Sequence, residues 1–273
     1  MQKVVDSNFL QCNELISYLS RSKDNKIVLT DYASMEAYKN NTLISIYKSM
    51  TTPCRFPKQV VILKTTGVVC GLSGRASGLR RRLIDERQTR GFSEFCGHLS
   101  AAKAGDLFLR NQLLEHGRVA TAQMARVLAD VPNLPQVFHE MSKSYGGEEI
   151  SILRHGARLT DTIFQKLINN VLYLAAIFFA NHPYVNRRPN FDELINTFIF
   201  RFPLCGNLLM LNWVSEGSQM TVRPDKLRND LVDLNFAVFA TFFYGLLSAD
   251  KKLRGIHKKA SDLLAVIAKA WQA

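Results

Sequence analysis

Short apolar runs alternate with amphipathic stretches in the first part of the chain. Residues 7–20 carry apolar side chains at helical spacing, which predicts an opening amphipathic helix. The β-branched run 26–30 predicts a buried strand that delivers Asp31 at its carboxyl end, and residues 33–50 return to a helical pattern. A second strand is expected at 59–63. Strand, helix and strand in this order predict a parallel α/β sheet.

The last third of the chain has the same mixed character. Apolar runs at 208–214 and 219–222 predict strands on either side of a turn, and 231–243 predicts an apolar helix. A short strand is then expected at 246–248, directly before Asp250. A basic helix closes this region, so helices and strands alternate here as they do near the start.

The middle of the chain differs from both ends. From about residue 98 to 200 the periodicity is mostly helical and is broken by prolines and glycines. No linker-like composition separates the three regions. We therefore expect one domain over residues 1–273, with a mainly helical insertion at about 76–205.

Composition indicates a folded protein with a basic surface. Hydrophobic residues make up 47% and charged residues 21%, which is ordinary for a globular domain and argues against a disordered chain. The 35 Lys and Arg against 23 Asp and Glu give a net charge of +12. A surplus of this size favours a polyanionic partner, because neutralised phosphates release condensed counterions. Nucleic acid is the expected partner; non-specific contact through a basic surface is the alternative.

Cysteine use and apolar segments bear on the cellular compartment. The five cysteines are scattered without a C-x-x-C pair, which argues against a disulfide framework and a structural zinc site. The start of the chain lacks the apolar core of a signal peptide. The apolar run 171–180 is too short to cross a bilayer and is expected to be a buried helix. These features predict a reduced, cytoplasmic protein with no membrane partner.

Aspartates follow the predicted strands and open a late helix. Asp31 and Asp250 each end a strand, while Asp230 and Asp233 lie three residues apart on one helix face. The carboxyl ends of parallel strands meet at one edge of a sheet, where carboxylates repel one another unless a cation neutralises them. Oxygen ligands suit Mg²⁺ or Mn²⁺, which can activate water against a phosphodiester. The alternative is structural, because each aspartate stands where a helix cap is favoured.

Two segments resemble a known family. Segment 228–256 contains N-D-L-V-D at the start of an apolar helix and G-L-L-S-A-D around the following strand. This order resembles the C-terminal half of PIN-like nuclease domains, and the strand ending at Asp31, within 26–38, resembles their first motif. The resemblance implies a single PIN-like, Rossmann-like domain with a parallel sheet flanked by helices. It also implies a metal-dependent endoribonuclease or nuclease that uses Mg²⁺ or Mn²⁺, with RNA expected as the substrate ahead of DNA.

The resemblance further implies the catalytic residues. They are Asp31, Asp233 and Asp250 as metal ligands, Asp230 as an added or outer acid, and Glu36. Glu36 is included because the family has an acid just after its second strand, whereas the corresponding stretch 68–72 has none.

Glu36 follows Asp31 on the same predicted helix and is expected to replace the missing acid, with Asp106 as the alternative. The departure leaves open a second function: a catalytically degenerate PIN-like module that binds nucleic acid or a protein partner. A homo-oligomer is compatible with either.

Two basic clusters are candidate contacts for a nucleic-acid backbone, because guanidinium and ammonium groups bind phosphate oxygens. They are Arg75, Arg80, Arg81, Arg82, Lys251, Lys252 and Arg254. A solvated helix face is the alternative for both clusters.

A third function comes from the pattern R-N-x4-H, which begins at Arg110 and ends at His116. It resembles the motif of HEPN ribonucleases, which are helical and often metal-independent. The resemblance implies His116 as acid or base and Arg110 as a phosphate ligand.

Overall fold

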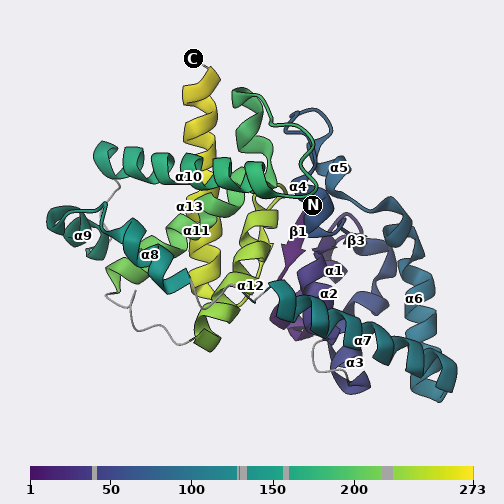
Figure 1. The fold of residues 1–273 in the computed structure, drawn as a ribbon. Coiled ribbons are helices and arrows are strands. Elements are labelled where there is room, and N and C mark those ends of the chain that lie inside the picture. The colour runs from purple at the N-terminus through teal and green to yellow at the C-terminus, as the bar shows by residue number, and fades with distance from the viewer. Residues whose placement is uncertain (39–41, 128, 130–133, 156–159, 217–223, 273) are drawn as a thin grey trace.

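The computed structural model describes the chain except residues 39–41, 128, 130–133, 156–159, 217–223 and 273. A four-stranded, all-parallel sheet in the order β3-β2-β1-β4 lies in one half of the molecule (Figure 1). Its strands are β1 (Gln2–Val5), β2 (Lys26–Leu29), β3 (Val60–Ile62) and β4 (Leu246–Leu247).

The register aligns Val4 with both Val28 and Leu246, so β1 pairs with strands from opposite ends of the chain. On the far side of β2, Val28 aligns with Val61 of β3. Val4 and Val28 are fully buried, as expected for a parallel sheet covered on both faces. The predicted α/β fold with a parallel sheet flanked by helices is confirmed at this level.

Helices make up most of the rest of the chain. They are α1 (Asn13–Arg21), α2 (Asp31–Tyr38), α3 (Leu43–Arg55), α4 (Thr66–Cys70), α5 (Leu79–Leu83), α6 (Glu86–Ala104), α7 (Leu107–Val127), α8 (Leu134–Ser142), α9 (Gly147–Arg154), α10 (Asp161–Asn181), α11 (Phe198–Ser215), α12 (Pro224–Ala240) and α13 (Lys251–Gln272). The described residues also form the short 3-10 helices η1 (Ser7–Gln11), η2 (Pro57–Gln59) and η4 (Phe191–Asn196).

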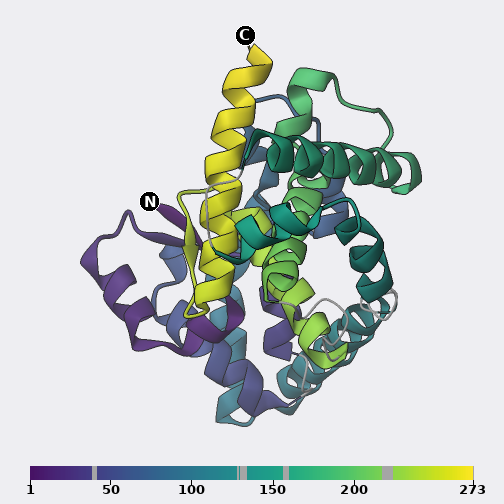
Figure 2. The same cartoon turned by 90° about the vertical axis from the view of Figure 1, so that its left-hand side faces the viewer.

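These helices form two groups. Helices α1 to α7 lie with the sheet, and α6 packs against its edge strand β3. Helices α8 to α13 form a largely helical half around α11, which packs against α9, α10, α12 and α13. The C-terminus of α13 extends to the end of the molecule opposite α3 (Figures 1 and 2).

Several predicted elements have different boundaries or types. The opening helix 7–20 is two helices, η1 and α1, because the backbone at Cys12 is extended. The range 33–50 holds α2 and α3 rather than one helix. The predicted strand 208–214 is wrong, since it lies inside α11. The predicted strand 219–222 lies outside the described residues.

The error at 208–214 has a physical cause. An apolar run carries no periodicity that separates a buried strand from a buried helix. Helix α11 is buried on almost every side, including Leu208, Met210 and Trp213, so its sequence lacks a polar face.

Helix α10 is longer and more exposed than the run 171–180 predicted. Within the described residues it alone is long and apolar enough to cross a membrane, which by itself is weak support for a span. Only 33% of its apolar window is buried. Val171 and Ala175 are buried, whereas Tyr173 is 67% exposed, so the expected buried helix is buried on one face only.

One cysteine pair contradicts the expectation of reduced thiols. Cys54 of α3 and Cys96 of α6 form a disulfide, while Cys12, Cys70 and Cys205 are free. The two bonded residues are 42 positions apart, and only the packing of α3 beside α6 brings them together. The spacing of cysteines along the sequence could not reveal this.

Candidate metal centre

The candidate centre starts at the end of β1. Asp6 follows this strand directly and is only 2% exposed. Its N–H donates to the Leu247 carbonyl at 2.9 Å, which continues the pairing of β1 with β4. One carboxylate oxygen accepts from Ser248 Oγ at 2.8 Å, and the other accepts from the Asn8 N–H at 3.2 Å. Asp6 is thereby fixed at the carboxyl edge of the sheet.

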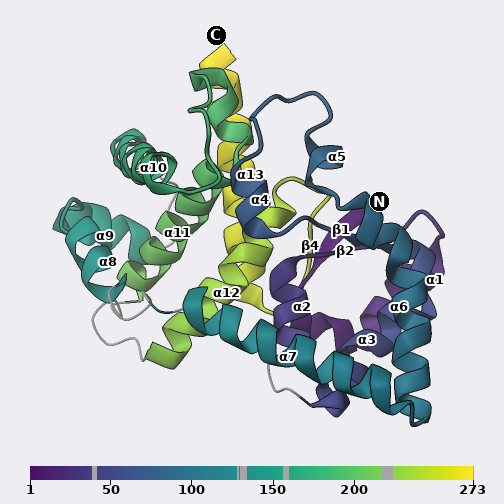
Figure 3. The same cartoon turned by 45° about the vertical axis from the view of Figure 1, so that its right-hand side comes forward.

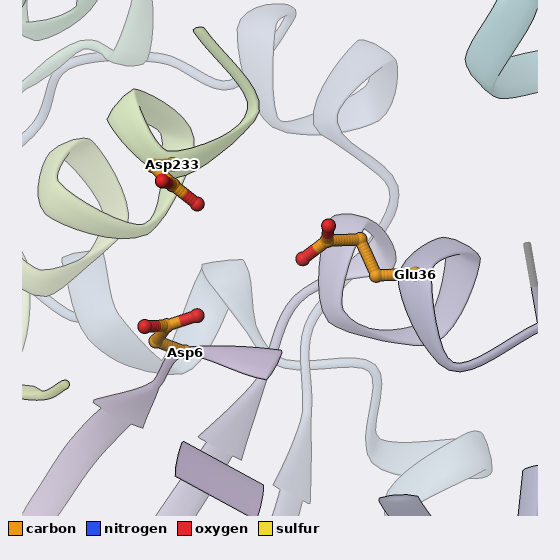
Figure 4. Close-up of side chains that lie close together, drawn as sticks. All are labelled: Asp6, Glu36 and Asp233. Atoms are coloured by element: carbon orange, nitrogen blue, oxygen red, sulfur yellow. The ribbon is translucent and has the colours of Figure 1, made fainter. Parts of the chain in front are cut away.

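Two further carboxylates converge on Asp6. Glu36 extends from α2 and accepts a hydrogen bond from the Ser7 hydroxyl, while Asp233 extends from α12. One oxygen from each of Asp6, Glu36 and Asp233 lies within 4.8 Å of the others. The three side chains point toward a common space (Figure 4). We call these three residues the acidic centre.

The acidic centre brings several negative charges close together. Burial, together with the nearby carboxylates of Asp6, Glu36, Asp250 and Asp230, raises the pKa of Asp233 to about 8. Burial also raises the pKa of Asp6, although its hydrogen bonds from Ser248 and Asn8 act against the rise. Like charges this close cannot all ionise at neutral pH without a cation. A bound divalent ion would supply that charge.

Asp250 and Asp230 flank the acidic centre. The Asp250 carboxylate caps α13 by accepting from the N–H groups of Lys252 and Leu253, at 2.6 and 3.0 Å. Asp230 is buried and pairs with Lys252 Nζ. Its second oxygen is buried and has no hydrogen-bond partner among the described residues. Both carboxylates therefore place charge near Asp233, although Asp250 caps α13 and Asp230 pairs with Lys252.

Asp31, predicted as a metal ligand, lies elsewhere. Its oxygens accept from the Thr66 N–H at 2.7 Å and the Thr66 hydroxyl at 2.8 Å, which ties α2 to α4. Asp31 and Glu36 are five residues apart, and so about 140° apart around the helix axis. A side chain at position 31 consequently faces away from the centre that Glu36 enters. The pKa of Asp31 is raised by burial, and the Thr66 hydrogen bonds partly offset this.

Asp6 is the site residue that sequence reasoning missed. The strand before it offers only Val4 and Val5 as apolar residues, too few for a clear strand pattern. The available signal was an apolar pair followed directly by an acid, the arrangement that was noted at Asp31. Ser7 and Ser248, which orient Glu36 and Asp6, were also missed.

Several predicted basic contacts have internal partners. Lys252 pairs with Asp230, and Arg254 donates to the Ser248 carbonyl at 3.1 Å, so both brace the acidic centre from α13. Lys251 is exposed at the start of α13.

The second basic cluster lies around α5. Arg82 donates to Ser73 and to the Arg75 carbonyl, and Arg81 pairs with Glu86. Arg80 stacks over the Tyr244 ring, 4.3 Å from its centroid. Three of these four side chains therefore already make contacts within the protein.

The alternative residues do not belong to the acidic centre and lie on α7 or, for Asp106, directly before it. Asp106 caps this helix by accepting from the Leu109 N–H at 3.0 Å. Arg110 and His116 are exposed on the same helix.

Comparisons with known proteins add no family to this description. No family model matches the chain, and neither does any curated protein or solved structure. Any function assigned to the acidic centre must therefore follow from its own residues.

Proposed function

We propose that this chain is a metal-dependent nuclease, which hydrolyses phosphodiester bonds with Mg²⁺ or Mn²⁺ held by Asp6, Glu36 and Asp233. The observation that carries the proposal is the convergence of these three carboxylates within 4.8 Å at the carboxyl edge of a parallel sheet. Ligands of α/β sheets bind at this edge. The net charge of +12 supports a nucleic-acid substrate, and we favour RNA over DNA.

The donor set fits a hard divalent cation. All three groups offer carboxylate oxygens, and no cysteine or histidine belongs to the acidic centre. Mg²⁺ keeps several of its waters when a few carboxylates hold it. Such an ion lowers the pKa of a bound water and stabilises charge on a phosphoryl oxygen.

The residues of the acidic centre would have different roles in metal binding. Asp6 is held on both oxygens, and Glu36 is oriented by Ser7, so both are positioned before an ion arrives. Asp233 carries a proton at neutral pH in the absence of a cation and would release it when one binds. Hydrolysis then adds water across one P–O bond, which leaves a phosphate monoester and a hydroxyl. Exposed Lys251, beside Asp250, would contact the backbone of the substrate.

A PIN-like family assignment is part of this proposal. The order of Asp6 after β1, Asp233 in α12 and Asp250 after β4 supports it, with Asp6 taking the place first given to Asp31. Glu36 supplies the acid that the stretch 68–72 lacks, which favours an active enzyme over the degenerate binding module.

Nuclease assays test the proposal directly. Purified protein is incubated with RNA, single-stranded DNA and double-stranded DNA in Mn²⁺, Mg²⁺ or EDTA. We expect cleavage only with metal, its loss in Asp233→Asn, and wild-type cleavage in Asp24→Asn, a control that removes an exposed carboxylate.

Other results would point to the alternatives. Cleavage that persists in EDTA and in Asp233→Asn, but is lost in His116→Ala and Arg110→Ala, would replace the proposal with the HEPN-like ribonuclease. Salt-sensitive nucleic-acid binding without any cleavage would instead establish the degenerate module.

A further inference from the structure

A second hollow lies on the other side of α2 from the acidic centre. It is lined by residues of β2, β3, α2, α3, α6 and α7 and has a volume of about 710 Å³. Figure 3 shows α2, α3, α6 and α7 arranged around this region. Small-molecule sites usually enclose about 300–1,000 Å³, so this cavity has the size of a ligand site.

The inner wall of the cavity is apolar. Leu29, Met35, Leu63 and Phe92 line it, and each is less than 9% exposed. Tyr38 adds a second aromatic ring from α2. An aliphatic or aromatic ligand would remove its apolar surface from water on entering this space, and this burial favours binding.

The charged residues of the cavity occupy two positions. Arg87, Glu94 and His116 are exposed and lie at the mouth of the cavity. Solvent screens their charges there, and the positive charge of Arg87 offsets the negative charge of Glu94. Asp31 is mostly buried where β2 meets α2 and lines the interior. Among the described residues no Lys, Arg or His forms an ion pair with Asp31, whose hydrogen bonds all come from neutral groups.

The walls are held together covalently as well as by packing. The Cys54–Cys96 disulfide joins α3 to α6, two helices that contribute to the lining. Helix α7 packs against both α6 and α2 and supplies a further wall. The cavity is therefore framed by fixed elements.

We propose that this cavity binds a small organic cation, with an aromatic or aliphatic body and an amine that faces Asp31. The Asp31 carboxyl group accepts hydrogen bonds from neutral groups only and borders an apolar space, where attraction between a carboxylate and a cation is stronger than in water. The rings of Tyr38 and Phe92 add surfaces that favour a cation over an anion. This site does not depend on the proposed nuclease activity, because Asp31 takes no part in the acidic centre.

Three naphthalene probes of nearly equal size test the charge preference. They are 1-naphthylmethylamine, 1-naphthylmethanol and 1-naphthoate, and their binding to the full chain is measured by titration calorimetry. We expect the amine to bind about tenfold more tightly than the carboxylate, with the alcohol between them. Tightest binding of the carboxylate, or no binding of any probe at millimolar concentration, would overturn the proposal.

Two glycines of α6 provide a matched test of location. Gly91 lines the cavity and Gly97 does not, and a Cβ at either position meets no atom within 4 Å. Gly91→Phe should fill the cavity and abolish binding of the amine, whereas Gly97→Phe should bind it like the wild type. Equal binding by the two variants would place the probe elsewhere and overturn the proposal.

Asp31→Asn tests the role of the carboxylate. The variant should keep its affinity for the alcohol but lose the preference for the amine over the carboxylate. A preference that survives this substitution would refute Asp31 as the recognition group. If the variant does not fold, the probe ranking on wild-type protein and the glycine pair still decide the proposal.

Discussion

Helix α2 separates two regions in which buried carboxyl groups have different neighbours. On one side, Asp233 lies near other acids, whose charges favour its protonated form or a bound cation. On the other side, Asp31 lies beside an apolar cavity and receives hydrogen bonds from Thr66 and Tyr32. Both are aspartates at the carboxyl edge of the same sheet. Their neighbours, rather than their residue type or place in the sequence, give them different chemistry.

The largest expected effect comes from removing the best-fixed carboxylate of the acidic centre. Asp6→Asn should lower the metal-dependent cleavage rate by at least about 100-fold, because it removes a charged oxygen ligand while keeping the side-chain shape. Cleavage rates and Mn²⁺ affinity by calorimetry measure this, with Asp24→Asn as the control. A larger loss in Asp31→Asn than in Asp6→Asn would reverse the contrast between the two sides of α2.

The pH dependence of stability should report on the protonation of Asp233. The pKa of Asp233 is about 8 in the folded protein and 3.8 in the unfolded chain, so the folded state holds more protons between these values. In EDTA, the free energy of unfolding should therefore fall as the pH rises from 3.8 toward 8. The stabilisation that the folded state gains by binding this proton is fully present below pH 3.8 and is lost as the pH rises toward 8.

Urea denaturation across this pH range measures the slope. Asp233→Asn should flatten it, and Mn²⁺ should oppose the fall by binding the ionised centre. A slope unchanged in Asp233→Asn would show that this residue is not the titrating group.

The disulfide should stabilise the side of α2 that holds the cavity. Cys54→Ser opens a loop of 42 positions, and we expect a loss of about 2–4 kcal/mol in the free energy of unfolding. Urea denaturation without reductant measures it, and Cys12→Ser, at a free cysteine, should change little. Alkylation of five cysteines instead of three in unreduced, unfolded wild-type protein would contradict the disulfide.

The smallest effect concerns the anchoring of Asp31. Thr66→Val removes the hydroxyl that donates to this carboxylate but keeps the N–H, and should cost about 1–2 kcal/mol of stability. Thr51→Val, on the exposed face of α3, is the matched control and should cost less. Thermal denaturation compares the pair. Equal effects would show that Thr66 contributes nothing beyond its backbone contact.

Local patterns predicted much of the fold. The β-branched run before Asp31 gave β2, and the apolar stretch after Asp230 gave most of α12. Strand β1 was missed because a four-residue strand with two valines has too few positions to show a pattern. Its identity depends on pairing with β2 and β4, which local sequence does not contain.

Only part of the acidic centre could be predicted, because local sequence does not contain tertiary packing. Glu36 and Asp233 were proposed as catalytic residues, and the structure brings them together with Asp6. Choosing between Asp6 and Asp31 required knowing which side of α2 faces α12. That is a property of tertiary packing, as is the meeting of Cys54 with Cys96.

The hydrogen bond between Asp6 and Ser248 has a consequence for biosynthesis. It joins residues 242 positions apart, and β1 acquires its β4 neighbour only through the same long closure. Such pairings form slowly, because loop entropy must be lost before the contact is gained. At ribosomal rates of about 5–20 residues per second, β4 is synthesised roughly ten seconds or longer after β1. During that time one edge of β1 is open, and the acidic centre lacks both Asp233 and the Ser248 hydroxyl that orients Asp6.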